Sequence, residues 1–259
     1  MYHENDPCDC QSESDSIPAY HSQARPWRYA KLPSLVFGVE LEVLCRDVDA
    51  CIALRESLPS GWLAERDGSL DGERGLEIVG PPLSFEENIK RWKPVLERAL
   101  ALRTVGWEAG KGYGMHVSAN RAVLSPYLLG KLLVFVNHNA DLSRRVAGRK
   151  AIYAGDYGQK KITQGKDQTG KYEPVALFEK RIEFRIFRST LLWTGFMRNL
   201  EFTSASIAFC REASALELTE TNFLQWLKRP ERNSEFPNLA VHLGVRSSVK
   251  HNAPGKEEK

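Results

Sequence analysis

The segment Gly-Val-Glu-Leu-Glu at residues 38–42 decides the fold class, because it embeds two carboxylates in an apolar run that extends from Leu35 to Cys45. An extended chain places alternate side chains on one face, so Glu40 and Glu42 point together while the intervening aliphatic side chains point the other way. Two like charges on an apolar strand are costly unless a cation, a ligand or solvent neutralises them. The pattern predicts a strand whose polar face is either wetted by solvent or part of a binding site.

Three further segments place polar side chains in short apolar strands. Residues 75–82, Gly-Leu-Glu-Ile-Val-Gly-Pro-Pro, contain one glutamate and are stopped by prolines. Residues 112–118 place His116 in a third strand, and residues 181–188 alternate charged with apolar side chains around Glu183. Strands joined by turns, with helices following in blocks, predict an α+β fold with a mainly antiparallel sheet.

The order of these segments resembles the amidoligase family, which belongs to the carboxylate-amine ligase group with glutamine synthetase and glutamate-cysteine ligase. The matching pieces are GVELE at 38–42, Asp67-Gly68-Ser69, GLEIVGPPL at 75–83, GMHVS at 114–118 and IEFRIFRST at 182–190. The resemblance implies a glutamine synthetase-like catalytic domain, with a curved, mainly antiparallel β-sheet flanked by helices.

The resemblance also implies a reaction, the ATP-dependent joining of a carboxylate to an amine. That reaction is uphill in water, so such a ligase first forms an acyl phosphate, from which the amine displaces phosphate. Bringing nucleotide and substrate anions together requires divalent cations, here Mg²⁺ with Mn²⁺ as an alternative, held by oxygen ligands. By resemblance, Glu40, His116 and Glu183 hold the metal nearer the transferred phosphoryl group. Glu42 and Glu77 hold the metal nearer the carboxylate substrate.

His116 has two readings, since a lone histidine in an apolar strand is often a satisfied core residue. The glycines before it and the Ser118 hydroxyl on the same face favour a site, with Ser118 contacting the cofactor. His138 lacks such support and is expected on a helix, as a structural or exposed residue.

Arginines near the carboxylates are candidates for anion binding. Arg185 lies two residues from Glu183, where a guanidinium either clamps a phosphate oxygen or forms an ion pair with that carboxylate. Arg181 shares this face, whereas Arg188 falls on the other one unless a bulge intervenes. Arg149 either reaches phosphate or complements the dipole of the helix before it.

Asp67 is the candidate for activating the amine. A carboxylate there could orient the incoming ammonium and take its proton, although Asp-Gly is also a preferred turn dipeptide. Family members in this group use three carboxylates at the metal nearer the substrate. Here Gly80-Pro81-Pro82 replaces the expected partner after Glu77.

The chain divides into a flexible N-terminal tail at 1–30, a catalytic domain at 31–245 and a flexible C-terminal tail at 246–259. Helices are expected at 85–102, 126–142, 193–212 and 221–228, the last with Thr219 or Thr221 as N-cap. Residues 153–172 are rich in Gly, Lys and Gln, which predicts either a loop that closes over substrate or a solvated hairpin.

Composition is typical of a soluble globular protein: of 259 residues, 42% are apolar and 27% charged, and mean hydropathy is −0.39. No stretch approaches the length of a membrane span, and five cysteines without a secretory signal predict reduced thiols and a cytoplasmic location. A formal charge of +3 does not point to nucleic acid.

The expected partners are a carboxylate substrate and an amine substrate, either of which is an amino acid, a peptide or a protein side chain. A companion amidotransferase or peptidase-like protein is compatible with the sequence. The alternative function is a metal-dependent hydrolase or nuclease that uses the same carboxylates and histidine, with the lysines of 153–172 serving a polyanion.

Overall fold

The computed structural model describes residues 17–18, 32–66, 70, 72–107, 112–149 and 173–246. Most of both expected tails lies outside these residues. So do Asp67 with its neighbours Gly68 and Ser69, and the whole 153–172 segment.

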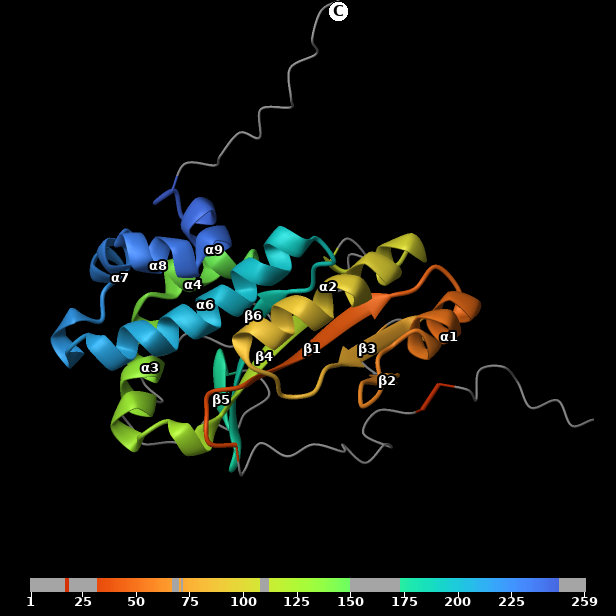
Figure 1. Ribbon diagram of the computed structural model, residues 1–259, viewed down its shortest axis with the longest axis horizontal. Helices are drawn as coiled ribbons and strands as arrows, with labels where there is room; N and C mark the ends of the chain where they lie inside the picture. The colour runs from red at the N-terminus through yellow and green to blue at the C-terminus, as the bar shows by residue number, and fades with distance from the viewer. Residues whose placement is uncertain are drawn as a thin grey trace, which may run out of the picture.

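One sheet runs through the described residues (Figure 1). Its strands are β1 (Phe37–Leu44), β2 (Leu63–Glu65), β3 (Gly75–Val79), β4 (Gly114–Asn120), β5 (Val175–Leu177) and β6 (Arg181–Arg188). They are ordered β2-β3-β1-β4-β6-β5, and every neighbouring pair is antiparallel. The four expected strands are present, and the prediction of a mainly antiparallel sheet is confirmed.

Helices fill the connections and the C-terminal part of the described chain. They are α1 (Val48–Glu56), α2 (Phe85–Ala101), α3 (Pro126–His138), α4 (Ala140–Ala147), α6 (Trp193–Glu212), α7 (Glu220–Leu227), α8 (Pro230–Glu235) and α9 (Pro237–His242), with short 3₁₀ turns η4 (Arg121–Val123) and η5 (Ala215–Glu217). Serine and threonine set several starts: Ser84, Ser125 and Thr219 each accept a backbone N–H from the first turn of α2, α3 and α7.

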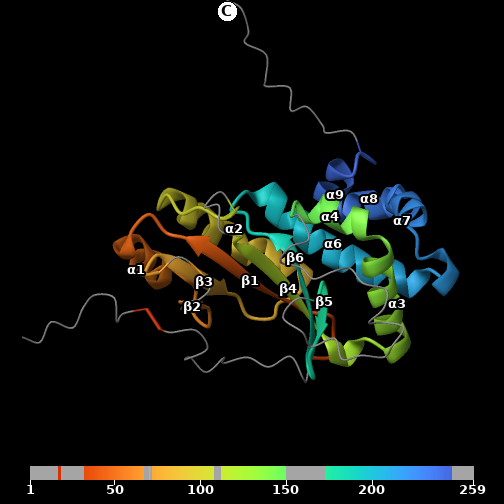
Figure 2. The ribbon, with the colours of Figure 1, turned by 180° about the vertical axis from the view of Figure 1, so that it is seen from behind.

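The sheet has one apolar and one polar face, as the alternation of its strands requires. Val39, Leu41 and Val117 are fully buried on the apolar face. Helices α2 and α6 cover that face (Figure 1), where the rings of Trp92 and Phe196 lie with centroids 5.0 Å apart. Seen from behind, β1 and β4 lie in front of these helices, and no described helix crosses over them (Figure 2). The polar face is therefore the one left for chemistry.

The single helix expected at 126–142 is wrong, because the chain breaks at Asn139 into α3 and α4. The Asn139 amide donates to the Phe135 carbonyl at 2.8 Å and to the Leu218 carbonyl at 3.0 Å, and it accepts from the Glu220 N–H at 2.7 Å. These side-chain hydrogen bonds compete with the helical backbone pattern, so α3 ends here and α4 starts anew. His138, the last residue of α3, is exposed.

The alternation of β6 changes at a bulge. Val117 pairs with Phe184 but Met115 pairs with Phe187, so β6 has one residue more than β4 between these pairs. Arg188 consequently pairs with Gly114. The bulge that the sequence analysis allowed for is therefore present, and the simple two-residue alternation does not extend to Arg188.

Cys45, Cys51 and Cys210 are free and buried. None of the described helices is both long enough and apolar enough to cross a membrane.

Candidate functional site

Three adjacent strands bring Glu40, His116 and Glu183 together on the polar face. In the sheet, Glu40 of β1 pairs with His116 of β4, and Glu183 of β6 pairs with Ser118, two residues further along β4. Residues two apart share a face, so all three side chains project to the same side. Sequence segments up to 143 residues apart thus converge through strand pairing alone.

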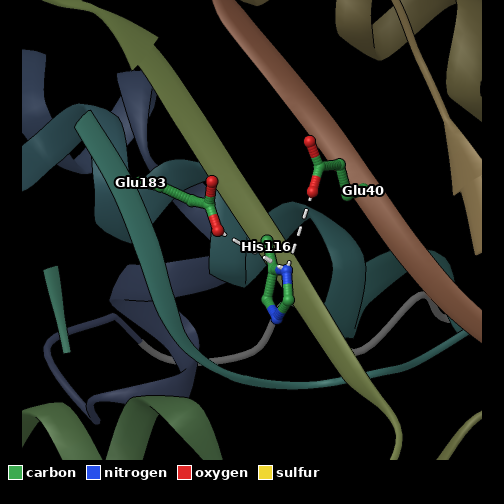
Figure 3. Close-up of side chains that lie close together, drawn as sticks. All are labelled: Glu40, His116 and Glu183. Atoms are coloured by element: carbon green, nitrogen blue, oxygen red, sulfur yellow. Dashed lines mark ion pairs between the residues drawn. The ribbon is translucent and has the colours of Figure 1, made fainter. Parts of the chain in front are cut away.

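The side chains point toward one another (Figure 3). His116 Nδ1 lies 3.8 Å from Glu40 Oε2 and 3.7 Å from Glu183 Oε1. All three residues are buried, and Glu183 is fully so. One donor atom from each lies within 4.8 Å of the others, which is the spacing of a cation site.

A second cluster lies beside the first and shares His116. Glu42, Glu77 and His116 offer donor atoms within 4.8 Å of one another, and His116 Nε2 lies 3.9 Å from Glu42 Oε1. Glu42 pairs with Glu77 across β1 and β3. The second cluster thus contains His116 in addition to the two glutamates that the resemblance assigns to the metal nearer the substrate.

Glu65 extends this row and was not among the sequence-predicted site residues. It pairs with Glu77 across β2 and β3 and is fully buried. Glu42, Glu77 and Glu65 therefore lie side by side on three neighbouring strands. The signal that could have revealed Glu65 is its place at the end of the short strand before the Asp67 turn. The register that aligns Glu65 with Glu77 cannot be deduced from the sequence of β2 or of β3.

Glu183 accepts from two arginines on its own strand. Arg181 donates from Nε and Nη2 to Glu183 Oε2 at 3.2 and 2.9 Å, and Arg185 Nη1 donates to Glu183 Oε1. The ion pair foreseen as one reading of Arg185 is present. Both arginines remain partly exposed, Arg181 at 26% and Arg185 at 19% of the side chain, so each can also meet a ligand.

Arg149 approaches the second cluster from the end of α4. Its guanidinium donates to the Gly112 carbonyl at 2.6 Å and the Phe187 carbonyl at 3.2 Å, and it lies over the Trp107 ring. The backbone of Gly114 passes so close that an added Cβ would lie 2.9 Å from Arg149 Nη1. Arg149 is therefore held against the site by the carbonyls of Gly112 and Phe187, beyond what helix-dipole complementation would require.

The remaining predicted residues differ in how far the structure describes them. Ser118 is buried on the polar face between Gly38 and Glu183, and within the described chain its hydroxyl has no hydrogen-bond partner. Asp67 lies outside the described residues. The Ser118 hydroxyl is thus a polar group that a bound ligand could satisfy.

The donor chemistry fits a hard divalent cation. Four glutamates and one histidine offer carboxylate oxygens and imidazole nitrogen, which are ligands of Mg²⁺ and Mn²⁺. Buried carboxylates packed this closely repel one another unless positive charge lies among them. Arg181 and Arg185 balance Glu183, and a cation between Glu42 and Glu77 would reduce the repulsion in the second cluster.

The chain was compared with known proteins. No protein-family model matches the sequence, and no curated protein matches it. Among solved structures, the chain matches one in the crystal structure of the complex between the prokaryotic ubiquitin-like protein Pup and its ligase PafA, with a TM-score of 0.43 and 10% sequence identity. The match covers 82% of this chain, and it spans 62% of the length of the other.

Proposed function

We propose that the protein is an ATP-dependent carboxylate-amine ligase that forms an amide or isopeptide bond through an acyl phosphate, on a glutamine synthetase-like sheet. The observation that carries this proposal is the pair of carboxylate clusters that share His116 on the polar face of an antiparallel sheet. Together with the segment order that resembles the amidoligases, this geometry favours a ligase that uses two cations.

In this proposal the two clusters have different tasks. Glu40, His116 and Glu183 would hold Mg²⁺ or Mn²⁺ near the transferred phosphoryl group, and Glu42 and Glu77 would hold a second cation near the substrate carboxylate. When bound, the cations supply charge neutralisation between anions that would otherwise repel each other. Glu65, buried beside Glu77, supports that second set.

The arginines and Ser118 would position the nucleotide. Glu183 would orient the guanidinium groups of Arg185 and Arg181, and both would donate to phosphate oxygens as negative charge shifts. Arg149 would donate to an anion beside Glu42, and the Ser118 hydroxyl to a phosphate oxygen. Asp67 would orient the amine and accept its proton, a role proposed from the sequence alone.

The acid and the amine are proposed only as classes: an amino acid, a peptide or a protein side chain. A companion amidotransferase or peptidase-like protein would be compatible with either class. We propose a cytoplasmic setting, in keeping with the free thiols of the three described cysteines.

Thermal unfolding with a non-hydrolysable ATP analogue and Mg²⁺, added separately and together, tests the proposal. Ligand binding to the folded state raises the midpoint by mass action, so the expected shift requires both components. Glu42→Gln should abolish it, because the amide keeps an acceptor for the Gly114 N–H but loses the charge that binds a cation. Glu97→Gln, on an exposed position of α2, is the matched control.

The same experiment separates the alternative function. A hydrolase or nuclease would be stabilised by metal alone and would turn over without nucleotide. A shift with Mg²⁺ alone, or an unchanged shift in Glu42→Gln, would therefore exclude the proposed ligase site.

A further inference from the structure

Two arginines outside the carboxylate clusters have no acidic partner among the described residues. Arg198 of α6 is only 8% exposed, and among the described residues its side chain donates only to the neighbouring Asn199 amide oxygen, from Nε at 3.2 Å and Nη2 at 3.0 Å. The Arg188 side chain, at the end of β6, makes neither a hydrogen bond nor an ion pair within the described chain. Buried guanidinium groups are normally paired, so this arrangement requires an explanation.

The fold holds the two arginines next to each other. Asn199 accepts from the Arg198 guanidinium through its amide oxygen and donates through Nδ2 to the Arg188 carbonyl at 3.5 Å. Arg188 Nε packs against Gly148, the left-handed residue that ends α4, where an added Cβ would lie 2.8 Å from it. Helices α4, α6 and α9 gather around the end of β6 in both views (Figures 1 and 2).

The surroundings add positive charge. The pKa of Arg198 falls to about 10 through burial and the nearby Arg188. His242 of α9 donates to the Arg145 carbonyl at 3.0 Å, and partial burial together with Arg198, Arg145 and Arg188 lowers its pKa. Burial is the larger cause of both shifts, and the neighbouring arginines act in the same direction.

The described acidic groups nearby do not neutralise the pair. Asp141 of α4 forms an ion pair with Arg144 at 2.9 Å, and Glu220 of α7 forms one with Arg145 at 2.8 Å. Glu201, one turn after Arg198, instead accepts from Asn238 and Leu239. The carbonyl end of α4 contributes only a partial negative charge.

We propose that Arg188 and Arg198 form an oxyanion-binding site at the junction of β6, α4, α6 and α9, separate from the two carboxylate clusters. Two guanidinium groups match the planar oxygens of a carboxylate or of a phosphate, and an anion between them would offset the cost of holding both charges. Partly exposed Arg188 provides access, and buried Arg198 forms the floor. The site requires neither a metal nor a nucleotide, so it stands independently of the proposed ligase activity.

The test is thermal unfolding of the full chain in a buffer free of phosphate and sulfate, with chelator present. Inorganic phosphate is titrated against chloride of matched ionic strength, and succinate is titrated in a parallel arm. Phosphate should raise the midpoint of the parent protein, and Arg188→Gln should weaken the apparent affinity by about tenfold or more, since one charge-assisted hydrogen-bond donor is lost. Arg211→Gln, at an exposed position of α6, should respond as the parent does.

Arg198→Met provides a second and opposite readout. Replacing the buried charge by an apolar chain should raise the midpoint without phosphate and remove the gain from phosphate. A response to succinate as well as phosphate would assign the site to carboxylates too, and a response to phosphate alone would assign it to phosphate esters. No gain in the parent, or an equal gain in the parent and both variants, would overturn the proposal.

Discussion

At the scale of single residues, the candidate site depends on a close approach that only glycine permits. Gly114 donates its N–H to Glu42, and the space beside its Cα is occupied by Arg149 Nη1, His116 Nε2 and Glu42 Oε2 at 2.9, 3.3 and 3.4 Å from an ideal Cβ. A side chain at this position would push the Arg149 guanidinium away from His116 and Glu42, the two prospective metal ligands. Gly114 therefore couples the backbone of β4 to the geometry of both clusters.

Gly114→Ala should lower the free energy of unfolding by about 1–3 kcal/mol, as overpacking does. It should lower the free energy of metal-dependent nucleotide binding by a larger amount. Urea unfolding and the ligand-induced shift in unfolding temperature measure the two effects. Gly130→Ala on α3 is the control, since nothing lies within 4 Å of its added Cβ, and it should be neutral or stabilising. Unchanged ligand binding in Gly114→Ala would contradict the close approach described.

Arg185→Lys tests whether that side chain acts beyond its ion pair. An ammonium can still balance Glu183, but it cannot reproduce the two-pronged donor. Nucleotide binding should persist while the turnover number for ADP release falls by roughly 100-fold, the cost of losing one oriented donor. Equal losses of binding and turnover would instead indicate a purely structural ion pair.

At the scale of elements, Asn139 determines how three helices meet. Its amide ends α3 through the Phe135 carbonyl, contacts the Leu218 carbonyl and caps the first N–H of α7 at Glu220. The sequence predicted one helix through this region because the apolar spacing continues across the break. The spacing of apolar residues indicates which helix face is buried. It does not indicate that a side chain will form hydrogen bonds with backbone N–H and C=O groups and so end the helix.

Asn139→Ala should destabilise the protein by about 2–4 kcal/mol, because three hydrogen bonds are lost and buried partners remain. Urea unfolding monitored by circular dichroism measures the change. The neighbouring exposed His138→Ala should change stability by less than about 0.5 kcal/mol. Similar values for the two variants would show that the break does not depend on this amide.

The packing of α9 on α6 should depend on pH through Glu201. Burial raises the pKa of this carboxyl from 4.5 to about 7, although its hydrogen bonds from Asn238 and Leu239 oppose the rise. Between these values the folded state keeps a proton that the unfolded state releases. The free energy of unfolding therefore falls as pH rises through this window, and it levels off above about 7.

Glu201→Gln should remove this dependence. Relative to the parent, the variant should gain about 3 kcal/mol between pH 4 and 8, the free-energy equivalent of the shift in pKa. Chemical unfolding at intervals across this range gives the difference directly. Parallel stability curves for parent and variant would mean that Glu201 is already ionised in the folded state at neutral pH.

At the scale of the whole molecule, one antiparallel sheet carries the structure. Strands β1 and β4 occupy its centre, and β2 and β5, of three residues each, occupy its edges. Native-state hydrogen exchange should therefore be slowest at amides of β1 such as Val39 and Leu41, which exchange only on global unfolding. Amides of β2 should exchange through smaller openings. Equal protection of β1 and β2 would imply that the sheet opens only as a unit.

The sequence was sufficient for the central strands and for the residues on their polar face, because a period of two assigns each side chain to a face. It was insufficient where pairing decides the outcome. Glu65 lies beside Glu77 because of the register of β2 with β3. The position of Arg188 depends on a bulge, where β6 advances by three residues while β4 advances by two. Helix α1 was also missed, since its nine residues alternate too little to signal a buried face.

His116 faces Glu40 and Glu183 through Nδ1 and Glu42 through Nε2. An uncharged imidazole carries one lone pair and one N–H, so it can serve as a ligand on one side while it donates a hydrogen bond on the other. The two carboxylate sets are therefore inequivalent whenever the ring is neutral, and its tautomer decides which set gains a nitrogen ligand and which gains a proton donor. A ligand that fixes this tautomer on one side thereby changes the hydrogen-bonding character of the other, without any movement of the backbone.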